Sequence, residues 1–589
     1  MVYPTLNQNQ SSREMIDVFR GYNHNLRISN GEFYEMKNLT SSYYPVLSPR
    51  EKRGVYQSPY NIENGIVSDE IENPNGMISK DALCYVDGKD FIVNKYKVPD
   101  FLSAEGEKKL VSMGAYVIIM PDKKYINTLD LNDNGYIEAK KTINSGTLNY
   151  YPCNSNGKTY SIKVNSLSPN DGDYWYDSVA KALKRFSSSN GMWSTVSTTY
   201  VRLEASGIGE PFNVNDGVKI SGLTKVENLN GTSVIVNKGD NYIVITGLID
   251  SSIKTQSCDE NNVTVSRNMP DMDFIVESGN RLWGCKYGLV DNKVVNEIYA
   301  SKQGDFKNWN CFAGISTDSY VASCGTDGKW TGAVTHLGYP IFFKENCMHK
   351  VYGNYPAQYQ IQTTSCRGVQ NGCENSLAIV NEVLYYKART GICAYDGSLP
   401  TEISDVLGDE TYSYAVAGTL ASKYYVSMQN DNTKEWNMFV YDTKKGFWHK
   451  EDNVRVKYFC SNRGNLYYID GDSKHIFTVM SDENCKESEE VVKWMAETGV
   501  IGANMPDKKY ISNLLIRMKL DIGAKVRFFI QYDSEGDFTH LFTMTGTTLR
   551  SFSVPIKARR CDHFRLRIEG EGDAKIFSVT KTIEQGSDI

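Results

Sequence analysis

Short pairs of alternating strands, each joined by a polar turn, recur through the middle of the chain and constrain its fold most strongly. In each pair, β-forming residues alternate with polar ones on both sides of the turn, which is the pattern of a β-hairpin. Repeated sheets of this kind are typical of a β-propeller, which protects the edges of its sheets by radial repetition. We therefore predict a β-propeller of about six to eight blades. The pairs occupy residues 81–94, 114–130, 274–288, 338–353, 381–397, 422–450 and 457–479.

The length of the chain, 589 residues, exceeds what one hydrophobic core supports, so we expect several domains. With 39 Tyr and 47 Gly, the composition favours an all-β fold. We predict four parts. They are an extended N-terminal arm over 1–60, a discontinuous β-propeller over 61–140 and 266–490, an inserted small α+β or barrel-like domain over 141–265, and a C-terminal β-sandwich over 491–589.

The inserted region contains the one segment with a helical period, YDSVAKALKRF at 176–186. Tyr176, Val179, Leu183 and Phe186 fall at spacings of three and four, which predicts one apolar helix face. Asp177 or Ser178 could cap this helix. The strand-like segments that follow, within 216–247, predict a small antiparallel sheet.

The C-terminal region changes character again and gives six strand-like segments with short loops. In HFRLRIEG, Phe564, Leu566 and Ile568 alternate with Arg565, Arg567 and Glu569. This alternation predicts a strand with one buried and one solvated face, as in a β-sandwich.

Charge, cysteine content and hydropathy exclude several classes of protein. The net charge of −6 does not suggest a basic surface that wraps nucleic acid. The thirteen cysteines are scattered without a CxxC pair, which indicates free thiols in a reducing cytoplasm. No apolar run approaches the roughly 20 residues of a membrane helix, and the first residues carry no secretory signal. We expect no membrane association and no cofactor.

The strongest metal-like motif is DLNDNGYIE, which begins at Asp130. Asp130, Asn132, Asn134 and Glu138 match positions 1, 3, 5 and 9 of a calcium-binding loop. Position 12, which should supply a bidentate Glu, is Lys141. A hairpin with Asn-Gly at its tip explains the same residues without a metal. These residues are a weak calcium candidate, and we predict no metal site.

Other catalytic motifs are incomplete or missing. SNGKTY at 155–160 lacks the first glycine of a phosphate-binding loop, and the seven histidines form no HExxH pair. A propeller can hold a carboxylate pair for glycoside hydrolysis, but the sequence alone does not select one. We therefore predict no catalytic residues and a chain that is not an enzyme.

The segment 35–54, EMKNLTSSYYPVLSPREKRG, has neither a helical nor a strand period. It combines adjacent tyrosines and prolines with a basic cluster. We interpret it as an arm that contacts neighbouring subunits in an assembly, because tyrosine offers contact area at low side-chain entropy cost. The predicted contact residues are Tyr43, Tyr44, Pro45, Arg50, Lys52 and Arg53, of which the three basic ones would meet acidic surface on the adjacent subunit.

Several segments, in order, resemble structural proteins of tailed bacteriophages. The most specific are NLTSSYYPVLSPREKRG and NRLWGCKYGLVDNKVVNEIYASKQGDFKNW at 280–309, followed by GYPIFFKENCMHKVYG, TTSCRGV and GICAYDGSLPTEISDVLG at 391–408. The resemblance is to tail-tubular or nozzle proteins and to the related DNA-stabilisation proteins that plug the portal. Its core covers about residues 270 to 410.

The resemblance implies a virion subunit, made in the host bacterial cytoplasm, that forms a six-fold ring below the portal or along a short tail; its position at the head-tail junction, in a tail or on the capsid surface stays open. Its partners would be copies of itself, portal or adaptor or other tail proteins, and the genomic DNA that the ring retains and conducts. The insertion at 141–265 and the C-terminal domain have no match in that pattern. The alternative is a phage receptor-binding or glycan-binding adhesion protein, or another virion surface protein; a propeller glycosidase is a third hypothesis.

Overall fold

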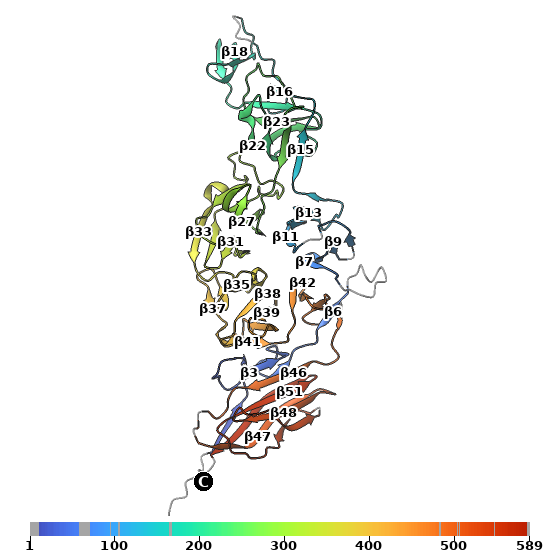
Figure 1. The fold of residues 1–589 in the computed structure, drawn as a ribbon, viewed down its shortest axis with the longest axis vertical. Helices are drawn as coiled ribbons and strands as arrows, with labels where there is room; N and C mark the ends of the chain where they lie inside the picture. The colour runs from blue at the N-terminus through green and yellow to red at the C-terminus, as the bar shows by residue number, and fades with distance from the viewer. Residues whose placement is uncertain are drawn as a thin grey trace, which may run out of the picture. The chain divides into compact units, whose positions relative to one another are not determined.

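The computed structural model describes residues 11–57, 71–94, 96–103, 106–163, 168–481, 485–503, 505, 507–546 and 548–585. Over these residues the chain is built from β-strands, as Figure 1 shows, and the prediction of an all-β fold is confirmed. The described helices are four short 3-10 turns, and none could cross a membrane. They are η1 (Glu227–Leu229), η2 (Pro356–Gln358), η3 (Glu374–Ser376) and η4 (Asp405–Leu407).

Four-stranded antiparallel groups recur seven times in the described residues, and six of them have their strands in chain order. Five stand as separate sheets, and two belong to larger ones. The first three groups are β7 (Pro74–Lys80), β8 (Ala82–Asp87), β9 (Asp90–Val93), β10 (Tyr96–Val98); β11 (Lys109–Met113), β12 (Tyr116–Met120), β13 (Lys124–Asn127), β14 (Asn134–Tyr136); and β26 (Phe274–Glu277), β27 (Leu282–Val290), β28 (Lys293–Ala300), β29 (Tyr320–Ser323).

The other four groups come from residues 332–478, and the last is completed from the N-terminal part of the chain. They are β30 (Gly332–His336), β31 (Tyr339–Lys344), β32 (Cys347–Tyr352), β33 (Gln360–Ser365); β34 (Ala378–Val380), β35 (Val383–Lys387), β36 (Ile392–Tyr395), β37 (Thr401–Glu402); β38 (Tyr412–Leu420), β39 (Lys423–Asn430), β40 (Trp436–Asp442), β41 (Phe447–Lys450); and β42 (Val456–Asn462), β43 (Asn465–Asp470), β44 (Ile476–Thr478), β6 (Gly54–Tyr56).

All seven hairpin segments predicted from the sequence form paired strands, so these predictions are confirmed. The turn between β8 and β9 illustrates why. Asp87 pairs with Asp90 across the turn, and Gly88 adopts the left-handed φ of +58° that glycine tolerates without strain. The buried residues of these two strands are consecutive, residues 83–86 in β8 and 91–93 in β9, so both faces of the hairpin are covered.

The chain forms two compact units, one of residues 1–107, 343–348 and 364–589 and one of residues 108–342 and 349–363. In the first unit, the N-terminal residues are strands of several sheets. β1 (Ser11–Ile16) pairs with β52 (Ala574–Gln585), and β3 (Glu32–Lys37) lies between β2 (Gly21–Tyr22) and β46 (Lys493–Thr498). β4 (Leu39–Thr40) pairs with β5 (Ser48–Pro49), while β6 pairs with β44 and with β45 (Cys485–Glu487).

The prediction of a separate extended arm over 1–60 is therefore corrected for residues 11–56. These residues lack a visible strand period because most of their strands are only two to six residues long. β4 and β5 pair with each other, but β1, β3 and β6 pair with strands more than 400 residues away, and local sequence does not reveal that pairing. Residues 1–10 and 58–60 of the predicted arm lie outside the described residues.

In the second unit, residues 139–267 form an eight-stranded sheet with a buried aliphatic core and a separate three-stranded sheet. The first has the order β15-β25-β21-β22-β23-β20-β16-β24, and the second is β17-β18-β19. The strands are β15 (Ala139–Ile143), β16 (Thr147–Cys153), β17 (Tyr174–Asp177), β18 (Ala182–Ser187), β19 (Met192–Thr195), β20 (Tyr200–Glu204), β21 (Gly217–Ser221), β22 (Gly231–Gly239), β23 (Tyr242–Thr246), β24 (Thr255–Ser257) and β25 (Val263–Arg267).

The helix predicted over 176–186 is wrong, because this segment is the hairpin of β17 and β18. Asp177 accepts hydrogen bonds at 3.0 Å from the backbone N–H groups of Val179 and Ala180, so the expected helix cap begins a turn instead. Lys181 then takes a left-handed φ of +46°, which ends any helical course. The α+β description of the insertion fails with this helix.

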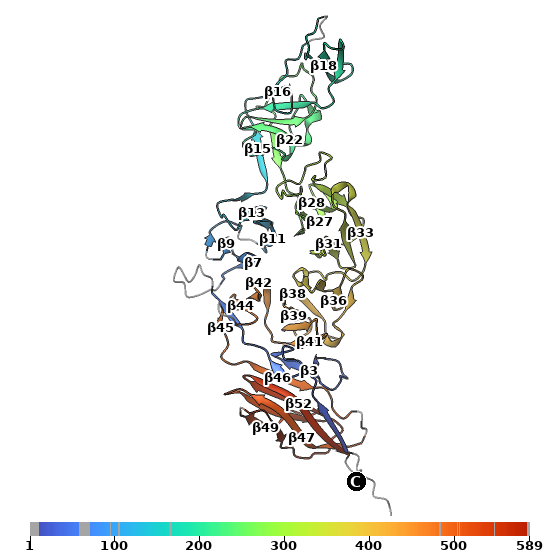
Figure 2. The ribbon, with the colours of Figure 1, turned by 180° about the vertical axis from the view of Figure 1, so that it is seen from behind.

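The C-terminal strands of the first unit lie in two sheets, coloured orange to red in Figure 2. One has the order β1-β52-β47-β50, and the other continues β38 to β41 through β2, β3 and β46 to β51, β48 and β49. The strands not yet given are β47 (Lys509–Leu520), β48 (Lys525–Tyr532), β49 (Thr539–Thr545), β50 (Arg550–Val554) and β51 (Phe564–Glu571). In β51, Phe564, Leu566 and Ile568 are buried and the alternate residues are half-exposed, so the predicted alternation is confirmed.

Candidate functional site

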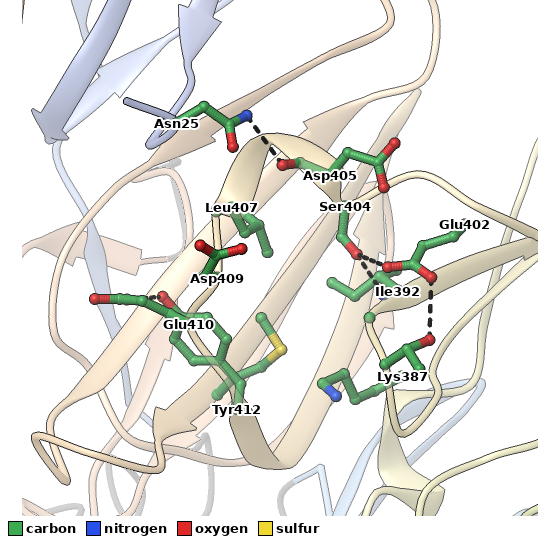
Figure 3. Close-up of a pocket in the computed structure, with 14 residues that line it drawn as sticks. Asn25, Lys387, Ile392, Glu402, Ser404, Asp405, Leu407, Asp409, Glu410 and Tyr412 are labelled. Carbon is green, nitrogen blue, oxygen red and sulfur yellow. Dashed lines mark hydrogen bonds between the residues drawn. The ribbon is translucent and has the colours of Figure 1, made fainter. Parts of the chain in front are cut away.

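A small pocket in the first unit gathers carboxylates from one short segment of the chain (Figure 3). Its volume is about 230 Å³, below the 300–1,000 Å³ usual for drug-sized ligands. It can therefore hold only a small molecule or one unit of a polymer. The lining residues are Asn25, Lys387, Thr390, Gly391, Ile392, Glu402, Ser404, Asp405, Leu407, Gly408, Asp409, Glu410, Tyr412 and Met428.

Glu402, at the end of β37, is fixed in the pocket by side chains on its flank. Its Oε2 accepts a hydrogen bond from Arg367 at 2.7 Å and another from the Thr390 hydroxyl at 3.0 Å. Gly391 approaches this carboxylate so closely that a Cβ there would lie 2.3 Å from Glu402 Oε1. The glycine is therefore needed for the local packing, and the Arg367 ion pair holds the Glu402 carboxylate in place.

Glu410 is held on the other side of the pocket, just before β38. Its Oε2 accepts hydrogen bonds from the Tyr412 hydroxyl at 2.6 Å and from Asn430 Nδ2 at 2.8 Å. Burial, together with this hydrogen bond, raises the pKa of Tyr412 well above its usual range, so Tyr412 is a permanent donor. The carboxylate is thereby positioned with acceptor capacity left for a ligand.

The remaining charges make the pocket an acceptor-rich environment. Asp405 and Asp409, from η4 and the loop that follows it, are exposed at the pocket. Lys387 Nζ donates to Gln370 Oε1 at 2.8 Å and to the Ala388 carbonyl at 2.6 Å, and burial lowers its pKa. The pocket lining thus has four carboxylates and one lysine. This excess of acidic groups disfavours an anionic ligand and favours a ligand that donates hydrogen bonds.

Two of the predicted contact residues, Arg50 and Arg53, are buried inside the chain. Arg53 NH2 lies 2.9 Å from Glu451 and 2.8 Å from Asp452, and Arg50 NH1 lies 2.7 Å from Glu489. The acidic partners expected on an adjacent subunit are therefore in the same chain, and the prediction is corrected for both arginines. The sequence alone does not distinguish arginines that are buried and paired within the chain from arginines on its surface.

The other predicted contact residues lie nearer the surface. Lys52 pairs with Glu487 at 2.7 Å, and the two side chains are 35% and 56% exposed. Tyr43 and Tyr44 are 42% and 38% exposed, with the ammonium groups of Lys575 and Lys445 over their rings. Pro45 follows them and is also exposed. For these residues the subunit contact stays a prediction.

The weak calcium candidate is a loop between β13 and β14 whose polar groups bond to one another. Asp130 Oδ1 accepts hydrogen bonds from the backbone and side chain of Asn132, and Asn134 Nδ2 donates to the Leu131 carbonyl. Glu138 instead pairs with Lys123 at 2.9 Å. Asn134 and Gly135 lie in β14, so the hairpin tip is Thr128–Asp133 and not Asn-Gly. Over the described residues, no three His, Cys, Asp or Glu side chains are grouped to hold a metal.

The segment 391–408, which resembles phage structural proteins, also supplies much of the pocket lining. TEISDVLGDE, residues 401–410, has four acidic residues in ten, and this density was the available signal. What the sequence does not reveal is that Arg367, Thr390 and Asn430 come from three other segments to orient two of those carboxylates.

No family model and no curated protein sequence matches the chain. Similar solved structures include an exo-β-1,3-galactanase from Phanerochaete chrysosporium, with 8% identity, a TM-score of 0.22, and coverage of 52% of this chain and 94% of that one. PorZ, a surface component of the type IX secretion system of Porphyromonas gingivalis, has 12% identity, a TM-score of 0.25, and coverage of 82% and 70%. Phage phi92 endosialidase has 8% identity, a TM-score of 0.23, and coverage of 79% and 75%.

The prediction that the chain is not an enzyme is corrected by these comparisons. Two of the similar structures, the galactanase and the endosialidase, are enzymes. The absence of a catalytic motif in the sequence therefore does not exclude an enzyme. TM-scores of 0.22 to 0.25 are too low to assign any activity to this chain.

Proposed function

We propose that this chain is a saccharide-binding protein at the surface of a tailed-phage particle, with the pocket of Figure 3 as its site. The observation that carries the proposal is the pair of fixed carboxylates, Glu402 and Glu410, facing a cavity that also contains two exposed aspartates. The phage assignment is supported by the resemblance of residues 280–309 and of the segments around them to phage structural proteins.

The proposed scaffold is a seven-bladed β-propeller with an inserted all-β domain and a C-terminal β-sandwich. Seven four-stranded groups, six of them in chain order, support the propeller, because each is the size of one blade. The pairing of β6 with β44 supports ring closure, since a strand from the N-terminal part completes the last group. Two sheets that both contain C-terminal strands with buried alternate residues support the sandwich.

A saccharide fits the chemistry of the pocket because its hydroxyl groups are hydrogen-bond donors without charge. Hydroxyl donors and ionised carboxylates form short, strong hydrogen bonds, each worth about 1.5–3 kcal/mol. Glu402 and Glu410 are already oriented by Arg367 and Tyr412, so little ordering is needed when a ligand binds. A pocket of about 230 Å³ has room for one end or one unit of a glycan.

The Glu410→Gln variant is expected to weaken saccharide binding by about tenfold or more, because it replaces an ionised acceptor with a neutral amide of the same size. Binding is measured by probing an array of neutral oligosaccharides with the full chain and titrating the strongest one. Glu435→Gln, at an exposed position in the turn between β39 and β40, is the matched control and should bind like the wild type. Unchanged binding by Glu410→Gln would exclude the pocket. Release of reducing ends from the bound glycan would identify the site as hydrolytic.

A second candidate function is the ring-forming nozzle subunit, which retains and conducts DNA between the head and the tail. It is favoured by a groove of about 680 Å³ in the first unit, which contains Tyr43 and Lys52 from the predicted contact residues. Ile522, in the turn between β47 and β48, is 95% exposed at this groove, and Val491 is 49% exposed. Exposed apolar side chains that line a groove are typical of a protein interface.

Ile522→Asp is expected to prevent association of the chain with itself, because it replaces an exposed apolar side chain, which the contact would bury, with a charge that would be desolvated without a partner. The measurement is the molar mass of the purified chain by light scattering over a range of concentrations. Val179→Asp changes an equally exposed apolar residue, 94% exposed, in the hairpin of β17 and β18 and should leave association intact. A wild-type chain that is monomeric at all concentrations would argue against the ring.

A further inference from the structure

The three-stranded sheet of β17, β18 and β19 carries an aromatic face that the pocket does not use. In Figure 2 this sheet, labelled β18, is separate from the eight-stranded sheet that contains β16 and β22. Cross-strand pairs place Trp175 opposite Lys184, and Phe186 opposite Trp193. Because paired and alternate residues share a face, Trp175, Lys184, Phe186, Trp193 and Thr195 all lie on one side of the sheet.

The rings on this face contact one another but are not buried. The Trp175 and Trp193 centroids are 5.7 Å apart in an edge-to-face arrangement, and those of Phe186 and Trp193 are 5.3 Å apart. All three side chains are only partly buried. Leu183, the fully buried apolar residue of the sheet, lies on the opposite face together with Tyr176. Arg185, Met192 and Ser194 on that opposite face are exposed, so both faces of the sheet reach solvent, and the three rings keep part of their surface accessible.

The charges on the tryptophan face are neutralised within the chain. Lys184 Nζ lies 2.7 Å from Asp177 and 5.3 Å from the Trp175 ring centroid. A charged ligand would have to compete with this ion pair. A neutral ligand could instead place its C–H groups over the rings and its hydroxyl groups on Lys184, Asp177 and the exposed Thr195.

We propose that this face, the tryptophan face of β17 to β19, binds a neutral saccharide. The inference rests on the proposed function, because it assigns to the chain a second contact with the same class of ligand. The combination of partly exposed rings with polar groups that pair within the chain matches a sugar, which presents an apolar ring face and a polar rim. Because the sheet is short and distinct from the pocket, the two contacts can be removed separately.

The test uses the full chain and titrates cellohexaose, maltohexaose and chitohexaose while following tryptophan fluorescence and heat of binding. Thr195→Arg places a long charged side chain on the tryptophan face without removing a buried group. Ser194→Arg places the same side chain at the neighbouring exposed position, on the opposite face. We expect Thr195→Arg to weaken binding at least tenfold and Ser194→Arg to leave it unchanged. Trp175→Phe, which keeps an aromatic ring, should show an intermediate loss.

The outcomes separate this inference from the proposed function. Loss of binding in Thr195→Arg but not in Glu410→Gln supports the tryptophan face and overturns the pocket. Loss in Glu410→Gln alone overturns the tryptophan face and leaves the pocket. Equal weakening by Thr195→Arg and Ser194→Arg would overturn the tryptophan face as well, because the effect would not depend on the face. If the wild-type chain binds none of the three hexasaccharides, the tryptophan face is overturned.

Discussion

Arg53→Ala is expected to destabilise the first unit by about 3–5 kcal/mol, the usual effect of breaking one side of a buried ion pair. Arg53 is 3% exposed, and its guanidinium lies 2.9 Å from Glu451 and 2.8 Å from Asp452. Removing the arginine leaves the buried Glu451 with less compensation for its charge. Burial by itself would lower the pKa of Arg53, but Asp452, Tyr468 and Glu451 outweigh it, so the guanidinium stays charged.

The measurement is the midpoint of urea or thermal unfolding of the full chain. Lys52→Ala is the matched control, because the neighbouring Lys52 makes a solvent-exposed pair with Glu487 and should leave the midpoint unchanged. The double variant Arg53→Met and Glu451→Met should recover part of the loss, since both charges are removed together. Equal midpoints for Arg53→Ala and Lys52→Ala would contradict the proposed role of Arg53 in fixing the N-terminal segment to the sheets.

The wild-type chain is expected to lose about 2 kcal/mol of stability between pH 6.5 and 4.5 through His449 alone. His449, in β41, is 3% exposed, and burial with a smaller effect of Lys423 lowers its pKa from 6.5 to about 3, against the opposite effect of Asp442. In this pH range the unfolded chain binds a proton at His449 and the folded chain does not. Protonation therefore favours unfolding, and stability falls as the pH is lowered from 6.5 toward 3.

The test compares urea unfolding at pH 7 and pH 4.5 for the wild type and His449→Gln, which cannot gain the charge. The variant should lose less stability between the two pH values, even if it is less stable at pH 7. His540→Gln, at an exposed histidine, should follow the wild type. If His449→Gln shows the same pH dependence as the wild type, the histidine is protonated normally in the folded chain.

The hairpins were predictable because both of their strands and the turn lie within about 15 to 30 consecutive residues. In such segments, β-forming residues and the turn signal agree. The prediction of a helix over 176–186 was wrong because the local pattern is compatible with two structures. Its apolar residues fit a period of 3.6, but Tyr176 and Leu183 are cross-strand partners in a hairpin whose turn contains the exposed Val179. A spacing of seven residues is compatible with both structures, and only the turn at Asp177 decides between them.

The parts that the sequence could not reveal depend on distant partners. β1 pairs with β52 and β6 with β44, so the N-terminal segment resembled an unpaired arm. The candidate pocket has the same property, since Glu402 is oriented by Arg367 and Glu410 by Asn430. Acidic residues can be counted in the segment 401–410, but their arrangement around a cavity requires the fold.

The most direct test of the account is a crystal structure of the chain with the neutral oligosaccharide that it binds most tightly. We predict a sugar unit in the pocket with its hydroxyl oxygens within hydrogen-bond distance of the carboxylates of Glu402 and Glu410. An empty pocket in a crystal whose chain holds the same sugar at another surface would contradict the assignment of this site.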